Sequence, residues 1–139
     1  MKILLTMLML GVVAFATPRY DYTIQDVFEY YNINGNLSVK EDRWSFNEKS
    51  GYFKNKKVFF NSYVEDYGKC ANTDSCLIKV SFDLPYSNLS RVNMDIEITY
   101  KDLISLKNGN LNRNAQLICK GDNKDAFRKC EFLKENKIK

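Results

Sequence analysis

Apolar and polar residues alternate with period two along most of this 139-residue chain, most clearly between Arg91 and Tyr100. Such alternation indicates an antiparallel strand with one buried face and one face in water. The side chains expected on the buried face are Val92, Met94, Ile96, Ile98 and Tyr100. Residues 76–84 repeat the pattern, and Pro85 ends that strand because proline cannot donate a hydrogen bond to a neighbouring strand.

Shorter runs rich in aromatic and β-branched residues predict further strands at 38–46, 52–53, 58–64 and 115–119. Lys49-Ser50-Gly51 and Asn108-Gly109 provide turn signals between these runs. The segment after Cys119 is compatible with two structures. A strand would place Cys130 and Phe132 on one face, whereas a helix would align Phe127, Cys130 and Leu133.

The clearest helical period lies near the start of the chain. Ile24, Val27, Phe28 and Tyr31 are spaced three and four residues apart, which places them on one face of a helix. Thr23 precedes them and Asp26 follows three residues later, as in an N-terminal capping box. Gly35 provides a stop, so the pattern predicts a helix over 24–32.

One helix followed by several strands predicts an α+β fold, in which the N-terminal helix packs on a curved antiparallel sheet stapled by disulfides. The alternative is an all-β sandwich or a small barrel. The 19 aromatic residues in the chain provide apolar volume for either arrangement. Residues 17–139 are expected to form a single domain with a frayed basic tail at about 134–139.

The first sixteen residues, MKILLTMLMLGVVAFA, have the pattern of a secretory signal peptide. Lys2 precedes an apolar run, and Ala14 and Ala16 supply small residues at the expected cleavage point. The apolar run is short for a membrane span. The chain is therefore expected to be secreted, or periplasmic in a bacterium, with no integral membrane segment after cleavage.

An exported chain with four cysteines is expected to form two disulfides. The local pairing, Cys70 with Cys76 and Cys119 with Cys130, needs only short loops and is favoured over the two alternative pairings. No Cys-X-X-Cys motif is present, so the sequence gives no sign of a thioredoxin-like redox site.

The chain contains no histidine, which removes the commonest general base and the commonest zinc ligand. The cysteine spacings do not match paired zinc knuckles, and Lys124 stands where a calcium loop beginning at Asp122 needs an oxygen ligand. The carboxylates Asp95 and Glu97 share a strand face, as solvent-facing acids often do. We therefore expect no catalytic residues, no metal site and no cofactor.

The C-terminal third is mildly cationic, with ten basic and five acidic residues from Lys101 onward. The expected interaction surface lies there and comprises Lys120, Lys124, Arg128 and Lys129. It would favour an unknown protein or an anionic surface, and no nucleic acid is expected as a partner. Basic and aromatic residues also alternate between Tyr52 and Phe60, a stretch that a turn between two strands would explain equally well.

Two sequons, beginning at Asn36 and Asn88, would accept N-glycans in a eukaryote. The order of an early helix, later strands and two local disulfides resembles the general layout of secreted cystatins. The Gln-x-Val-x-Gly inhibitory hairpin of cystatins is absent, with Val58-Phe-Phe-Asn-Ser62 in the comparable region. The chain is therefore assigned to no family.

These observations predict a small exported binding protein without enzymatic activity, whose partner and oligomeric state the sequence does not reveal. Two alternatives remain open. The protein could inhibit a hydrolase through a loop near Ser50 or at 68–75, or it could carry a small apolar ligand between helix and sheet.

Overall fold

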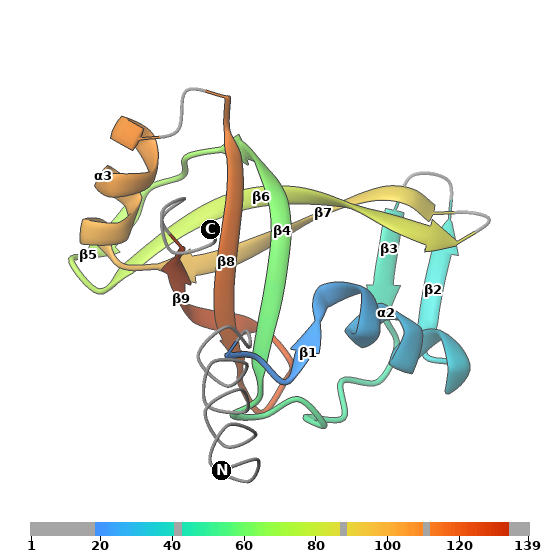
Figure 1. The fold of residues 1–139 in the computed structure, drawn as a ribbon. Coiled ribbons are helices and arrows are strands. Elements are labelled where there is room, and N and C mark those ends of the chain that lie inside the picture. The colour runs from blue at the N-terminus through green and yellow to red at the C-terminus, as the bar shows by residue number, and fades with distance from the viewer. Residues whose placement is uncertain (1–18, 41–42, 87–88, 110–111, 134–139) are drawn as a thin grey trace, which may run out of the picture.

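The computed structural model describes residues 19–40, 43–86, 89–109 and 112–133, and its main feature is a closed five-stranded barrel (Figure 1). The barrel strands are β4 (Lys57–Asp66), β6 (Ser75–Tyr86), β7 (Leu89–Ile98), β8 (Asn114–Gly121) and β9 (Phe127–Phe132). They follow the order β4-β8-β9-β7-β6, and a pairing of β4 with β6 closes the ring. The short strands β1 (Tyr22–Thr23) and β5 (Cys70–Asn72) extend the sheet beside β4 and β6.

Chain direction around the barrel defines its topology. Four of its five neighbouring pairs are antiparallel, whereas β7 and β9 are parallel and meet at Ile98 and Cys130. A helix, α3 (Tyr100–Gly109), connects the third barrel strand to the fourth. This connectivity is that of the OB-fold, a five-stranded Greek-key barrel.

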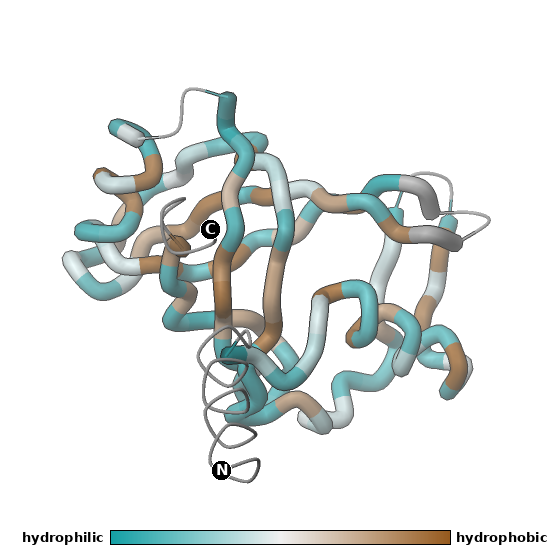
Figure 2. The backbone as a smooth tube through the Cα atoms, viewed as in Figure 1, coloured by the Kyte–Doolittle hydropathy of each residue, from teal (hydrophilic) through white to brown (hydrophobic). Residues whose placement is uncertain are grey.

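Period-two alternation fills the barrel interior. The expected inward face of β6 is buried throughout, at Cys76, Ile78, Val80, Phe82 and Leu84. Strands β4 and β8 contribute the buried side chains of Val58, Phe60, Val64, Ala115, Leu117 and Cys119. Hydrophobic and hydrophilic segments alternate along these strands in Figure 2, as a sheet with one packed face requires.

A second layer lies beside the far end of the β6–β7 hairpin (Figure 1). It consists of α2 (Ile24–Ile33) and a two-stranded sheet of β2 (Leu37–Lys40) and β3 (Arg43–Phe46). The predicted helix and its capping box are both confirmed. Phe28 of the helix packs against Trp44, Phe46 and Phe82, and the Trp44 indole donates a hydrogen bond to the carbonyl of Asn93. The β2–β3 sheet is thereby fixed to β7, and the helix to β6.

The predicted fold class is only partly right. The molecule is mostly β-structure and its barrel fits the alternative of a small barrel, because β4 pairs with β6 and so closes the sheet. The sheet is also not wholly antiparallel. The helix packs on the end of the β6–β7 hairpin and on the small sheet, and its buried side chains belong to the same hydrophobic core as those of the barrel.

Several local predictions were wrong. The strand β6 does not end at Pro85 but continues to Tyr86, and its register with β7 shifts between Asp83 and Tyr86. Tyr100 does not end a strand but begins α3, where Thr99 accepts a hydrogen bond from the backbone N–H of Asp102. Residues 38–46 form two paired strands in place of one, and Tyr52 and Phe53 lie in a turn. The ambiguous C-terminal segment is the strand β9, because its residues pair with both β7 and β8.

The pairing of β4 with β6 closes the barrel at Tyr63, Val64 and Asp66 and contains a bulge. Side chains reinforce this short contact. The buried Ser81 hydroxyl donates to Glu65 at 2.6 Å and accepts a hydrogen bond from Arg91 at 2.8 Å. Arg91 also pairs with Asp83, so β4, β6 and β7 are linked by one polar network.

The two disulfides join Cys70 to Cys76 and Cys119 to Cys130, which is the local pairing expected. Cys119 and Cys130 are buried inside the barrel, whereas Cys70 is exposed. Two disulfides fit an extracellular or otherwise oxidising compartment. Within the described ranges, no helix has the length and apolar character needed to cross a membrane. The expected signal peptide and the basic tail lie outside the described residues.

Replacing both Cys119 and Cys130 with serine should lower the free energy of unfolding by about 3 kcal/mol, because a loop of roughly twelve residues is no longer closed. Replacing Cys70 and Cys76 should cost less, about 2 kcal/mol, because that loop is shorter. Urea unfolding of both double variants measures the difference. A larger loss for the Cys70 and Cys76 variant would contradict the expectation.

Candidate functional site

The fold brings together two basic segments, residues 51–57 and 120–125, that are far apart in the sequence. Residues 51–57 run alongside residues 120–125, at the end of the barrel where β8 turns into β9. The Asn55 N–H donates to the Gly121 carbonyl at 2.9 Å, and the Gly121 N–H donates to the Lys56 carbonyl at 3.1 Å. These backbone bonds fix the register between the two segments.

Two glycines permit this close approach. A Cβ atom on Gly121 would lie 2.3 Å from the Phe53 carbonyl oxygen, and one on Gly51 would lie 2.6 Å from that of Asn123. Gly51 also has a φ of 71°, a conformation that other residues rarely adopt. Any larger residue at either position would separate the segments.

Five lysines gather along the joined segments, and we call this group the cationic edge. It comprises Lys54, Lys56, Lys57, Lys120 and Lys124, all of them exposed. Lys57 and Lys120 are direct cross-strand partners in β4 and β8. Among the described residues, none of the five forms an ion pair. Two carboxylates meet the main chain of these segments: Asp21 accepts from the Lys57 backbone N–H at 2.9 Å, and Asp122 accepts from the Lys124 backbone N–H at 2.8 Å.

The expected interaction surface is only partly brought together here. Lys120 and Lys124 belong to the cationic edge, but Arg128 donates to Asp122 at 2.9 Å and pairs with Glu97 at 3.5 Å. Its charge is therefore neutralised by its own chain. Lys129 occupies a left-handed conformation, with φ of 52°, where the β8–β9 register shifts.

Asp122 organises the turn that carries Lys124. Partial burial raises the pKa of its carboxyl, but N–H bonds from Ala126 and Lys124 and the Arg128 guanidinium outweigh that effect. The pKa of Asp122 therefore lies below its ordinary value. An ionised Asp122 holds the turn through these donors.

Asp125 is the buried polar centre of this end of the molecule, with 4% of its surface exposed. Its carboxylate accepts hydrogen bonds from the Tyr31 hydroxyl, the Gly51 N–H at 3.1 Å and the Phe53 N–H at 3.0 Å. Burial, followed by the hydrogen bond with Asp125, raises the pKa of Tyr31 to about 12. One carboxylate thus ties α2 and residues 51–53 to the β8–β9 turn.

Tyr52 lies between Gly51 and Phe53, whose backbone N–H groups donate to Asp125. Its ring stacks on Tyr30 with centroids 4.5 Å apart and an interplanar angle of 17°. Tyr22 lies against the same ring at 6.5 Å, and a hydrogen bond with Tyr52 raises the pKa of Tyr22. Tyr52 remains 51% exposed, so an aromatic side chain adjoins the cationic edge.

The remaining sequence candidates have structural partners. Glu97 accepts from Ser75 at 2.9 Å as well as pairing with Arg128, and Asp95 lies opposite Lys79. No group of three potential metal ligands occurs in the part of the chain that the structure describes. Asn36 is partly buried, and Asn88 lies outside the described residues.

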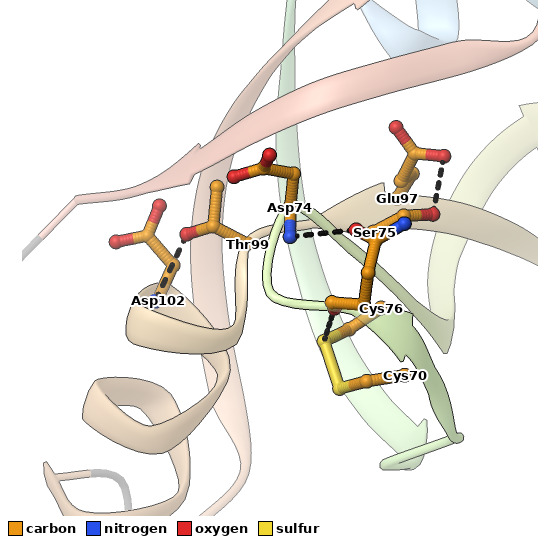
Figure 3. The surroundings of a disulfide bond; sticks show 8 residues. Cys70, Asp74, Ser75, Cys76, Glu97, Thr99 and Asp102 are labelled. Atoms are coloured by element: carbon orange, nitrogen blue, oxygen red, sulfur yellow. Dashed lines mark hydrogen bonds between the residues drawn. A yellow bond between two sulfur atoms is a disulfide. The ribbon is translucent and has the colours of Figure 1, made fainter.

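The loop closed by Cys70 and Cys76 protrudes beside the start of α3 (Figure 3). Residues 70–74 are exposed, while the Thr73 carbonyl accepts from the Tyr100 N–H at 2.9 Å. The side chains that flank this loop include Leu77 and Tyr100, both about half exposed. The loop is therefore held in place and accessible, as a binding loop would be.

Comparisons with known proteins return no family model, no curated protein and no solved structure that matches this chain. The likeness to the OB-fold concerns strand order, and a fold shared in this way carries no function by itself. Function therefore depends on the side chains that this barrel displays.

Replacing Asp125 with asparagine should lower the Tyr31 pKa from about 12 toward its ordinary value and destabilise the fold by about 3 kcal/mol. The amide has one acceptor oxygen, so one of the Gly51 and Phe53 N–H groups would face a donor. Spectroscopic titration of the phenols and urea unfolding measure the two effects. Asp95→Asn, which removes the same charge from an exposed site, should change neither.

The wild-type protein should lose stability as pH rises from about 10 to about 12. In that window the unfolded chain releases the Tyr31 proton while the folded protein retains it, because the folded-state pKa is the higher one. Urea midpoints at about pH 9 and about pH 11 test the sign. If Tyr31→Phe shows the same drop in urea midpoint between these two pH values as the wild type, the loss of stability comes from groups other than Tyr31.

Lys120→Glu should stabilise the protein by about 0.5 kcal/mol, because it replaces a like-charged pair opposite Lys57 with an attractive one. Lys124→Glu changes the net charge equally but lies in the turn, outside the strand pairing, and serves as the control. Thermal unfolding of the two variants compares them. An equal change in thermal stability in the two variants would show that the Lys57–Lys120 pair does not destabilise the sheet.

Proposed function

We propose that this protein is a small exported binding protein, without enzymatic activity, that holds an anionic partner on its cationic edge. The observation that carries the proposal is the set of five exposed lysines that lack counter-ions among the described residues. Their positive potential attracts anions and accelerates association with them.

The arrangement of the lysines supports this function more strongly than their number does. Directly opposed like charges destabilise a sheet, yet Lys57 faces Lys120 in the β4–β8 pairing. Backbone hydrogen bonds and two close-packed glycines fix the segments that carry the other lysines. A bound anion would relieve the repulsion without any rearrangement of the backbone.

A second candidate function, inhibition of a hydrolase, is supported by the loop from Cys70 to Cys76. That loop is exposed, closed by a disulfide and flanked by Leu77 and Tyr100. Of the two loops expected as a wedge, the one near Ser50 is tied down through the Tyr31 hydroxyl and Asp125. The carrier alternative has less support, because Phe28 packs directly against Phe46 and Phe82 between the helix and the sheet, where the ligand was expected.

Binding of inorganic polyphosphate, measured by calorimetry at physiological ionic strength, tests the leading proposal. The double variant Lys57→Gln with Lys120→Gln should bind about 30-fold more weakly, at about 1 kcal/mol for each lysine near an anionic surface. Raising the salt concentration should weaken wild-type binding as well, since exposed charges are screened.

The matched control is Lys79→Gln with Lys101→Gln, which removes the same charge from exposed positions on β6 and α3. This control should retain nearly all of the wild-type affinity. Equal losses of polyphosphate affinity in both double variants would show that only the net charge of the protein matters, and would contradict a defined site. Absence of polyphosphate binding by the wild type would contradict the proposal outright.

A further inference from the structure

We infer that the anionic partner is an acidic polysaccharide, whose sugar rings rest on Tyr52 while its carboxylates meet the lysines of the cationic edge. The inference rests on the proposed function and names the class of ligand for the same site. Its independent observation is the stacked, half-exposed Tyr52 at the end of the row of lysines.

Tyr52 offers a flat apolar surface backed by a second ring. Tyr30 covers one of its faces at an interplanar angle of 17°, and half of the side chain remains open to solvent. Sugar rings present C–H groups on their faces, which pack against aromatic planes, while their hydroxyls remain solvated. Tyrosine also carries a hydroxyl that can bond to such a ligand.

The position of Tyr52 is fixed before any ligand arrives. The N–H groups of Gly51 and Phe53, on either side of it, both donate to the buried Asp125 carboxylate. Gly51 in turn packs against the Asn123 carbonyl, one residue from Lys124. Stacking surface and cation are therefore held on adjoining segments, which lowers the ordering cost of binding.

The type of cation separates a polysaccharide from a nucleic acid. All five side chains of the cationic edge are lysines, and the neighbouring Arg128 is occupied by Asp122 and Glu97. Arginine is the side chain that suits phosphate and nucleic acid best, because its planar fork binds two oxygens at once. Lysine ammonium groups act as point charges, which pair with carboxylates along a sugar chain without a fixed two-oxygen geometry.

The apolar side chains disfavour a membrane as the partner. Among the residues whose burial the structure describes, the large aliphatic side chains with substantial exposure are Ile33, Val39 and Leu77, which lie on α2, β2 and β6. None of them belongs to the segments that form the cationic edge. Tyr52 lies flat on Tyr30, whereas a membrane anchor needs apolar side chains that project into the bilayer.

Affinities for oligogalacturonate, inorganic polyphosphate, single-stranded oligothymidylate and vesicles of phosphatidylglycerol test the inference. Tyr52→Ser should weaken oligogalacturonate binding about tenfold and leave polyphosphate binding unchanged, because only the sugar uses the aromatic face. Tyr52→Phe should retain most of the oligogalacturonate affinity. Tyr100→Ser is the matched control, since Tyr100 is also half exposed but lies on α3, and it should change neither affinity.

The lysine double variant separates the two proposals. If Lys57→Gln with Lys120→Gln weakens binding of both anions but Tyr52→Ser weakens neither, the proposed function stands and the polysaccharide inference falls. Stronger wild-type binding to oligothymidylate or to the vesicles than to oligogalacturonate would also overturn it. Circular dichroism melts confirm that each variant is folded, so that a lost affinity reports on the site.

Discussion

A carboxylate buried in a protein must be supplied with hydrogen-bond donors, and this requirement at Asp125 organises the end of the molecule that matters most. Its donors come from α2, through Tyr31, and from residues 51–53, through two backbone N–H groups. Removal of the carboxylate would leave buried N–H groups without acceptors, which costs more than the bonds themselves contribute. The helical layer, the tyrosines and the barrel therefore share one polar anchor.

The cationic edge depends on the same anchor and on backbone packing. Lysines are flexible and strongly hydrated, and five of them would scatter if the segments that carry them moved independently. Here Gly121 lies under the Phe53 carbonyl, and Asn55 and Lys56 bond to it through the main chain. The positive charge is thus concentrated by the backbone and by the Asp125 anchor, and none of the five lysines forms an ion pair with another described residue.

Elements with a strong local period could be predicted from the sequence. The helix at Ile24 and the strands from Cys76 and Arg91 have regular apolar spacing, and short loops favoured the observed disulfides. The sequence does not show that β4 pairs with β6 and so closes the barrel. Several strands have the same period-two pattern, and this pattern does not specify which strands become neighbours. The helix α3 was missed because only two of its described residues are buried, Leu103 and Leu106, and two positions are too few to reveal a helical repeat. The site could be predicted only in part. Lys120 and Lys124 were expected on an interaction surface, but no local pattern in the sequence shows that residues 51–57 lie beside them.

The burial of Cys119 and Cys130 imposes an order on the maturation of the chain. Both sulfur atoms lie inside the closed ring of strands, where an oxidising enzyme cannot approach them. Thiol exchange needs an accessible sulfur, so this bond has to form while the strands are still open. Cys70 stays at the surface, and the Cys70–Cys76 bond can be made or exchanged after folding. The protein therefore carries one disulfide that has to form before the barrel closes and another whose Cys70 sulfur stays on an exposed residue afterwards.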